Sequence, residues 1–365
     1  MKVAPLHRVF DADPGIASVI VHTGQHYDER MSQVFFDQLG LPKPNYFLGI
    51  GGGTHTQQTA KIMMAFEEVL DQEQPDLVVV VGDVNSTVAC ALTAVKKNIK
   101  VAHVEAGLRS GDRGMPEEIN RIVTDGIADM LFVSEEGGVD NLLAEGVSKE
   151  RIHFVGNVMI DSLVHFLPKA DTLDVDQILK ENLLLPAKEA LKPVGDFALM
   201  TMHRPSNVDH AEGLQKIISI ISGLPKYLTV VFALHPRTKK NLERFGLFDA
   251  LANLPNVVLT HPLSYLDFLK LMKETRLVIS DSGGIQEETT YLKVPCITFR
   301  SSTERPSTVK IGSNTLIAEL DVEKVLTTAD KVLKNAQVES SQVPALWDGQ
   351  AAKRVRDILM DGSKS

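Results

Sequence analysis

Short apolar runs rich in β-branched residues recur along the whole chain, and longer segments of helical periodicity separate them. Parallel strands covered by helices have this composition, because both faces of each strand are buried. The alternation therefore predicts repeated β–α units and an α/β fold. The expected strands are residues 17–23, 76–82, 99–105, 129–134 and 151–156 in a first half, and residues 197–203, 228–235, 256–262, 276–281 and 295–300 in a second.

The two halves share the same order of strands and helices, so we expect two Rossmann-like domains that face each other across a cleft. A chain of 365 residues is long enough for two cores of ordinary size. In residues 168–195 the strand pattern vanishes and Pro, Asp and Lys accumulate, which predicts a hinge there. The predicted domains are residues 1–167 and 196–348, and ligands are expected beyond the carboxyl ends of their strands.

The charge and cysteine content exclude some kinds of partner. The formal net charge of -9 does not provide the basic field that nucleic acids or anionic membranes require, so neither is expected as a partner. Neither a secretory leader nor a long uninterrupted apolar run is present, so we expect a cytoplasmic protein. Cys90 and Cys296 lie in apolar runs without metal-ligand spacing, which predicts two reduced, buried thiols.

Carboxylates follow two expected strands of the first half and begin the next helix. Asp83 follows residues 76–82, and Glu105 ends residues 99–105. Glu117 and Glu118 lie in the first turn of a helix, where the helix dipole favours acidic side chains. Because strand ends share one edge of a parallel sheet, we expect carboxylates and arginines to gather there: Asp83, Glu105 and Glu117, surrounded by Arg109, Arg113 and Arg121.

Each of these carboxylates also has a structural interpretation. Asp83 would then be only a turn or capping residue, and Glu105 would form a buried ion pair. One member of the pair Glu117 and Glu118 is expected to serve only the start of the helix. The sequence leaves these alternatives open.

The second half contains a candidate anion site. Ser282, Gly283 and Gly284 follow an expected strand and open a helix whose backbone amides could hold phosphate oxygens. Arg300 and Arg305 lie at and just past the end of the next expected strand. A turn of this kind beside arginines predicts a diphosphate site, although a tight turn alone would explain the glycines.

His203 and His235 each end an expected strand of the second half. A histidine at a strand end is either a hydrogen-bonded structural group or an acid–base catalyst. Sequence alone does not distinguish these two roles.

Eight motifs, in this order, resemble those of the non-hydrolysing UDP-N-acetylglucosamine 2-epimerases: HTGQHYD, GDVNST, HVEAGLRS, MPEEINR, TMHRPSN, DSGGIQEE, TERP and DGQAAKR. The resemblance covers nearly the whole chain. It implies a GT-B-like fold in which a C-terminal helix, residues 349–365, packs back on the first domain. It also implies a homodimer that needs no cofactor and no metal, and that supplies sugar nucleotide for cell-surface polysaccharide.

The implied reaction is inversion at C2 of UDP-N-acetylglucosamine, through elimination of UDP and re-addition to a 2-acetamidoglucal intermediate. The acid–base and sugar-site residues of the family fall on Asp83, Glu105, Glu117, Arg121 and His203. The UDP side falls on Phe268, Ser282, Gly283, Gly284, Glu288 and Arg305, with Glu288 on the ribose hydroxyls and Phe268 near the uracil. The resemblance also implies that Lys2 binds the substrate, on its UDP or its sugar part. Which carboxylate acts as the base in each direction stays open.

The chain departs from the family pattern in three places. Family members have a β-strand and a Gly-Thr-Arg-Pro-Glu loop before the lysine that Lys2 matches. An open slot in the first sheet would follow, so we expect low stability and little activity from the polypeptide as written. Ser206 replaces a usual glutamate. Residues 22–36 and 46–59 are closer to the archaeal and diamino-sugar branches than to the bacterial enzymes with a substrate-activated allosteric site, so that regulation is not assumed.

Other functions remain possible at this stage. One is a 2-epimerase of a diacetamido-uronic acid UDP-sugar, and another is a hydrolysing epimerase that releases free sugar. A third is a nucleotide-sugar binding protein without turnover. A nicotinamide enzyme is not expected, because residues 49–55, GIGGGTH, lack dinucleotide-binding spacing and predict a helix start near Thr56.

Overall fold

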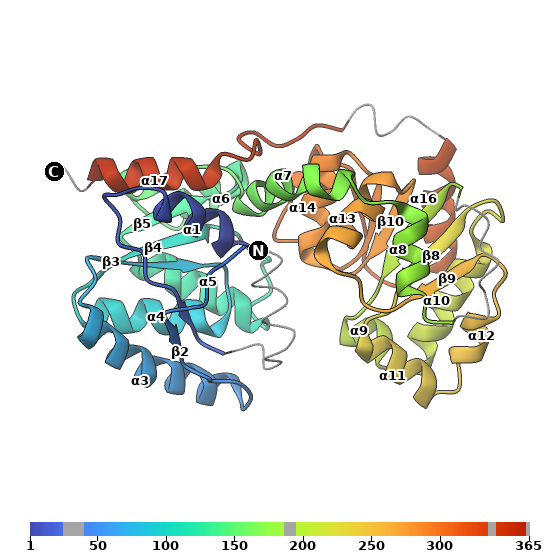
Figure 1. Ribbon diagram of the computed structural model, residues 1–365, viewed down its shortest axis with the longest axis horizontal. Coiled ribbons are helices and arrows are strands. Elements are labelled where there is room, and N and C mark those ends of the chain that lie inside the picture. The colour runs from blue at the N-terminus through green and yellow to red at the C-terminus, as the bar shows by residue number, and fades with distance from the viewer. Residues whose placement is uncertain (25–39, 186–194, 335–340, 363–365) are drawn as a thin grey trace. The chain divides into compact units, whose positions relative to one another are not determined.

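The computed structural model describes residues 1–24, 40–185, 195–334 and 341–362 (Figure 1). Parts of the HTGQHYD motif, of the predicted hinge and of the predicted C-terminal helix lie outside these ranges. The chain forms two compact units. Unit 1 is Met1–Ser162 with Ala345–Ser365, and unit 2 is Leu163–Pro344. The assignment of functional domains to the chain stays a proposal.

Unit 2 contains a parallel six-stranded sheet in the order β12-β11-β10-β7-β8-β9. Counted along the chain, this is the order 3-2-1-4-5-6 of a doubly wound fold. Apolar strand residues and the helices around them form the core. The strands are β7 (Phe197–Thr201), β8 (Thr229–Ala233), β9 (Val257–Thr260), β10 (Leu277–Ser280), β11 (Cys296–Phe299) and β12 (Asn314–Ile317).

The helices of unit 2 connect these strands and in several cases begin with a recognisable cap. Ser264 caps α13 by accepting a hydrogen bond from the amide of Asp267 at 3.2 Å. The helices are α8 (Val175–Asn182), α9 (Pro205–Val208), α10 (Ala211–Gly223), α11 (Pro236–Arg244), α12 (Phe248–Ala252), α13 (Tyr265–Glu274), α14 (Gly283–Leu292), α15 (Ser307–Lys310) and α16 (Val322–Lys334). Another, α7 (Val158–Asp171), begins in unit 1 and ends in unit 2.

Unit 1 contains two parallel sheets in its described residues. One has the order β3-β4-β5-β6, and the other pairs β1 with β2. No described strand joins β1 to β3. The strands are β1 (Val21–His22), β2 (Tyr46–Phe47), β3 (Leu77–Val81), β4 (Lys100–Ala106), β5 (Met130–Val133) and β6 (Ile152–Phe154).

Helices pack on both faces of the larger sheet in unit 1. Residues of α3 and α4 form one core cluster with Val78 and Val80 of β3. Residues of α1 and α17 form another with Ala102 and Val104 of β4, and α1 lies beside α17 (Figure 1). The helices are α1 (Val3–Asp11), α3 (His55–Glu73), α4 (Asn85–Lys96), α5 (Pro116–Ile127), α6 (Glu136–Ala144), the 3-10 turn η1 (Lys149–Arg151) and α17 (Ala351–Gly362).

The predicted α/β fold with parallel sheets is confirmed, and each of the ten predicted runs contains a strand. The run 17–23 contributes only the two residues of β1. The sequence analysis missed β2 and β12, because neither lies in a long apolar run. The predicted helix start near Thr56 lies next to the observed start of α3 at His55. Thr54 caps this helix through a capping box with Gln57. Within the described ranges, no helix combines the length and apolarity needed to cross a membrane.

Candidate active site

Glu105 is held at the carboxyl end of β4 in a backbone conformation that non-glycine residues rarely adopt. Its φ is +71°, in the left-handed region, which costs on the order of 1 to 3 kcal/mol. The pairing of β4 with β5 shifts register between Val104 and Ala106, so a bulge lies at this residue. Bulges re-aim side chains beside active sites. Glu105 is only 4% exposed and forms an ion pair with Lys2.

The neighbouring strand end is fixed by His103, whose side chain is fully buried. Its Nε2 lies 2.8 Å from the carbonyl oxygen of Gly82, and its Nδ1 lies 2.6 Å from Oδ1 of Asp125. Burial alone would raise the pKa of Asp125, but the hydrogen bond and charge of His103, together with Arg109, outweigh burial and lower it. Asp125 also accepts from the amide of Gly107 at 3.0 Å. This network ties the ends of β3 and β4 together.

Asp83 lies just after β3, and its side chain forms an ion pair with Arg121 of α5. Nη2 and Nε of Arg121 lie 2.8 and 3.1 Å from Oδ2 of Asp83, and Asn120 donates to the Asp83 carbonyl at 2.9 Å. Arg121 is 2% exposed, whereas the Asp83 side chain is 26% exposed. Asp83 is therefore held in place while part of its carboxylate stays accessible.

Glu118 is the member of the acidic pair that anchors the loop before α5. It accepts hydrogen bonds from the amides of Ser110 and Gly111, each at 2.9 Å, and from the Ser110 hydroxyl at 3.0 Å. Burial alone would raise the pKa of Glu118, but these bonds and the charge of Arg121 lower it. Glu117, one position earlier, is half-buried. Glu118 thus has the structural role that the sequence could not assign.

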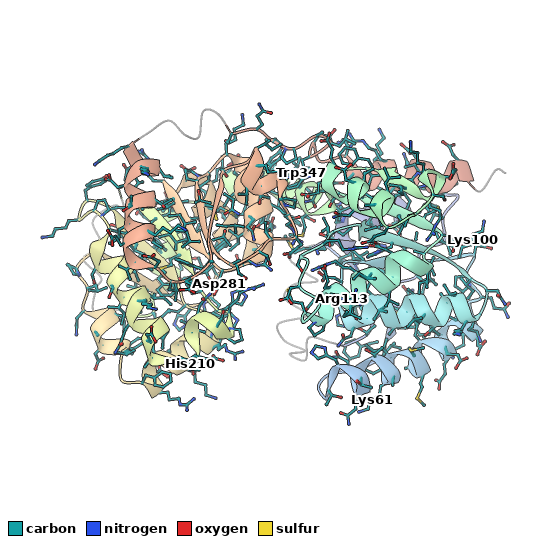
Figure 2. The ribbon with its side chains drawn as sticks, turned by 180° about the vertical axis from the view of Figure 1, so that it is seen from behind. Lys61, Lys100, Arg113, His210, Asp281 and Trp347 are labelled. Carbon is teal, nitrogen blue, oxygen red and sulfur yellow. The ribbon has the colours of Figure 1, made fainter. Side chains whose placement is uncertain are left out.

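The sequence predicted that Arg109, Arg113 and Arg121 surround the carboxylates. This prediction is wrong for Arg109. Its Nη1 lies 2.7 Å from Oδ2 of Asp125, and its Nη2 lies 2.7 Å from Oε2 of Glu145. The chain turns at Gly107, next to α6. An added Cβ on Gly107 would lie 2.4 Å from the carbonyl oxygen of Gly138 in this helix. Arg113 is exposed in the loop before α5 (Figure 2). Of the three, Arg121 contacts a predicted carboxylate.

In unit 2 the predicted anion-binding turn lies at the start of α14. Ser282 is the N-cap, and Gly283 and Gly284 form the first turn. A Cβ on Gly283 would lie 2.9 Å from Nη1 of Arg300 and 3.4 Å from Oε1 of Glu304. Glycine is therefore required for the close approach of this backbone to the arginines.

Arg300 and Arg305 reach this turn as a buried ion-pair network. Nε of Arg305 lies 2.7 Å from Oε1 of Glu287, and Nη1 of Arg305 lies 2.5 Å from Oε1 of Glu304. Glu304 also pairs with Arg300, whose Nη2 lies 3.1 Å from Oε2. Glu287 and Glu304 were not predicted as site residues, although they lie in the motifs DSGGIQEE and TERP. Their carboxylates hold the guanidinium groups of Arg300 and Arg305 close to Gly283.

Glu288, on α14, accepts a hydrogen bond from the Tyr265 hydroxyl at 2.9 Å. Burial raises the pKa of Glu288 to about 7; the bond from Tyr265 opposes this rise, and the charge of Glu287 adds to it. Phe268 lies one turn after Tyr265 on α13 and is half-buried. Glu288 and Phe268, the two residues that the resemblance places on the nucleoside, thus lie on helices that the Tyr265–Glu288 hydrogen bond joins.

His203 lies at the end of β7, beside the end of β10. Its Nδ1 is 3.0 Å from Oδ1 of Asp281, which directly precedes Ser282 (Figure 2). Unit 2 therefore brings His203 and the predicted anion-binding turn to one sheet edge, and unit 1 brings together Lys2, Asp83, Glu105 and Arg121.

Comparison with known proteins identifies the family of this chain. Residues 8–360 match the family described as UDP-N-acetylglucosamine 2-epimerase. The chain belongs to this family. The UDP-N-acetylglucosamine 2-epimerase of Methanocaldococcus jannaschii is 41% identical over 99% of this chain and 96% of the relative. The chain is therefore an epimerase, an enzyme of the isomerase class.

Solved structures of this family have the same fold. The crystal structure of the M. jannaschii enzyme in complex with UDP-GlcNAc and UDP has a TM-score of 0.85, with 99% of this chain and 96% of that chain covered. A Neisseria meningitidis UDP-GlcNAc 2-epimerase bound to UDP-GlcNAc is 28% identical, with a TM-score of 0.85 and the same coverage. A Pseudomonas aeruginosa relative, named UDP-2,3-diacetamido-2,3-dideoxy-D-glucuronate 2-epimerase, is 38% identical over 98% of this chain and 96% of its own length.

Proposed function

We propose that this epimerase inverts C2 of UDP-N-acetylglucosamine and forms UDP-N-acetylmannosamine. One observation carries the proposal: Asp83 and Glu105, at the carboxyl ends of adjacent strands, are paired with Arg121 and Lys2 in a member of this family. Inversion needs acid–base groups near a weakly acidic C–H bond, and held carboxylates supply them.

The reaction begins with loss of the C2 proton to a base of the enzyme. The electron pair of the C2–H bond forms a C1=C2 double bond, and the C1–O bond breaks so that its pair leaves on UDP. The products of this half are 2-acetamidoglucal and UDP. Return of UDP to C1, with a proton delivered to the opposite face of C2, completes the inversion and consumes nothing.

The proposed roles are divided between two sets of residues. Asp83, Glu105, Glu117 and His203 exchange protons, and Arg121 holds Asp83. Lys2 pairs with Glu105, which supports a place beside the substrate for both side chains. The remaining residues hold UDP: the turn residues Ser282, Gly283 and Gly284 with Arg305 for the diphosphate, Glu288 for the ribose and Phe268 for the uracil.

The UDP assignment has two supports in unit 2. The amides at the start of α14 carry the positive end of the helix dipole, which favours phosphate oxygens. The buried arginines beside Gly283 add positive charge at short range. Departure of UDP from C1 creates negative charge on the diphosphate, so these groups stabilise the transition state as well as the bound substrate.

The experiment is incubation of the protein with UDP-N-acetylglucosamine in D2O. We expect deuterium at C2 and a second C2 epimer, both measured by NMR. Free N-acetylmannosamine would instead indicate a hydrolysing enzyme, and binding without exchange would indicate a protein without turnover. A parallel incubation with UDP-2,3-diacetamido-2,3-dideoxy-D-glucuronate should give slower exchange, because the relatives named for UDP-N-acetylglucosamine are the more similar, at 41% and 40% identity against 38%.

We further propose that the enzyme is a cytoplasmic homodimer that supplies sugar nucleotide for cell-surface polysaccharide. Cys90 and Cys296 are free and buried, which suits a reducing compartment. Light scattering on the purified protein measures the dimer directly. A monomeric mass with full C2 exchange would contradict the proposed dimer and leave the proposed reaction intact.

A further inference from the structure

Two histidines lie close together at the carboxyl edge of the unit 2 sheet, and the partners of their Nδ1 atoms differ. His203 follows β7 and His235 follows β8, the neighbouring strand. Their ring centroids are 5.4 Å apart. The proposed mechanism uses only His203, so the difference between the two rings bears on which of them carries a proton.

The Nδ1 atom of His203 faces the fully buried carboxylate of Asp281 at 3.0 Å. Burial alone would raise the pKa of Asp281, but hydrogen bonds from His203, Asn207 and the Arg204 amide outweigh burial and lower it. An ionised carboxylate only accepts hydrogen bonds, so Nδ1 of His203 must carry a hydrogen. In the neutral ring the lone pair is then on Nε2. The side chain is 40% exposed, which keeps that ring accessible.

The Nδ1 atom of His235 has the opposite role. It accepts a hydrogen bond from the amide of Arg237 at 3.2 Å. A backbone amide only donates, so the lone pair is on Nδ1 and the hydrogen is on Nε2. Burial lowers the pKa of His235, the charges of His203 and Arg237 lower it further, and Asp281 partly offsets them. His235 is therefore a neutral ring with a fixed Nε2–H donor.

Backbone contacts make Asp281 a rigid partner for His203. Its carboxylate also accepts from the amide of His203 at 3.1 Å, the amide of Arg204 at 2.8 Å and Nδ2 of Asn207 at 3.0 Å. These bonds join the end of β10 to the loop after β7, two strands that pair directly. The orientation of the His203 ring thus follows from the position of this carboxylate.

Resting on the proposed function, we propose that Asp281 is a positioning residue for His203. It holds the Nδ1–H tautomer, so that Nε2 is the nitrogen that exchanges a proton with the substrate. When Nε2 gains a proton, the ring becomes an imidazolium whose charge lies beside Asp281; when it gives the proton back, the ring is neutral again. A neighbouring carboxylate orients and stabilises this cation without itself taking the proton.

The direct test is the tautomer of each ring, read from histidine nitrogen shifts of the substrate-free protein at alkaline pH. In the wild type we expect a hydrogen on Nδ1 of His203 and on Nε2 of His235, with His203→Gln and His235→Gln used to assign the signals. Asp281→Asn should move His203 toward the Nε2–H tautomer and leave His235 unchanged. An Nε2–H tautomer for His203 in the wild type would overturn the proposal.

Kinetics separate positioning from a structural role. Asp281→Asn should lower kcat by about 10²-fold, as expected for a misplaced acid–base group, and change KM by less than about threefold. In a His203→Gln background the same change should lower kcat by less than about threefold, because Asp281 acts through His203. Equal losses in both backgrounds, or loss of UDP affinity and melting temperature along with kcat, would overturn the proposal. Absence of C2 exchange in the wild type would instead contradict the proposed function, and the tautomers would still be measurable.

Discussion

The strands of the two units differ in how completely they are buried, and composition does not decide the difference. β3 of unit 1 has the sequence LVVVV, yet Leu77, Val79 and Val81 are only half-buried. β10 of unit 2 contains a serine in LVIS, yet all four of its residues are buried. β10 pairs with β7 and β11, whereas the structure pairs β3 only with β4 within its described residues. Burial alternates along β3, with Val78 and Val80 buried, so one of its two faces is less covered than the other.

The candidate chemistry also differs between the units. Unit 1 presents carboxylates that single cations hold in place, Arg121 for Asp83 and Lys2 for Glu105. Unit 2 presents helix amides and arginines that carboxylates hold in place. Proton exchange suits the first arrangement and phosphate binding suits the second, so substitutions of the unit 1 carboxylates and of the unit 2 arginines should affect different kinetic constants.

The largest expected effect is on turnover, from the carboxylates of unit 1. Asp83→Asn, Glu105→Gln and Glu117→Gln should each lower kcat by about 10² to 10⁴-fold, the range for a positioned acid or base. UDP affinity, measured by calorimetry, should change by less than about twofold, because the proposed UDP contacts are mainly in unit 2.

Glu118→Gln is the matched control for Glu117→Gln, since it weakens the anchor of the loop before α5 and should lower the melting temperature. Near-normal turnover in all three active-site variants, with folding intact, would remove the proposed division of roles.

The next largest effect compares matched valines in the two sheets. Val278 of β10 is fully buried and Val79 of β3 is half-buried. Val278→Ala should cost about 2.5 kcal/mol of folding free energy and Val79→Ala about 1 kcal/mol, because less apolar contact is lost at the less covered site.

The only tryptophan, Trp347, donates to the Ser134 carbonyl in unit 1. Its fluorescence reports unfolding of unit 1, and circular dichroism reports both units. Equal costs for the two valines would show that the incomplete cover of Val79 does not reduce its contribution to stability.

The pH dependence of stability should distinguish Glu288 from Glu118 and Asp125 of unit 1. Its folded pKa is about 7 and its ordinary value is 4.5, so the folded state binds the proton more tightly. The stabilisation is fully present below about pH 4.5 and is lost as the pH rises toward 7, about 3 kcal/mol in total. Glu288→Gln should flatten this decline in a urea titration followed by circular dichroism between pH 4.5 and 8.

For Glu118 and Asp125 the sign is opposite. Their folded pKa values are lowered, so their stabilisation is present above the ordinary carboxyl range and is lost as the pH falls below it. Trp347 fluorescence follows that loss in unit 1. If the stability of Glu288→Gln declines between pH 4.5 and 7 as steeply as that of the wild type, a group other than Glu288 causes the decline.

The smallest expected effect concerns the arginine network of unit 2. Arg305→Lys keeps a positive charge beside Glu287 but loses the planar fork that suits a diphosphate, so we expect about tenfold weaker UDP binding by calorimetry. Arg276→Lys, at an exposed ion pair with Asp196, is the control and should bind UDP normally. Unchanged affinity in Arg305→Lys would place the diphosphate on another arginine, with Arg204 and Arg237 the next to be tested.

Sequence alone identified ten of the twelve described strands, the α/β fold and the motif segments that carry the candidate site. These features depend on local patterns: apolar runs for buried strands, a capping box before α3 and glycines where φ is positive or the backbone approaches another group. The sequence also placed Asp83 and Glu105 at strand ends, and the structure shows each with a basic partner, Arg121 and Lys2. A resemblance in motif order then supplied the candidate reaction.

Only the tertiary structure decided which neighbouring groups interact. It separated Glu117 from Glu118, moved Arg109 to Asp125 and Glu145, and gave His203 and His235 different partners. It also left β3 half-covered although its sequence is the more apolar. These outcomes depend on contacts between residues far apart in the chain, such as the contact of the His203 Nδ1 atom with the Asp281 carboxylate. Periodicity along the sequence reports which residues are apolar or charged, but burial and hydrogen bonding depend on what the fold places beside them.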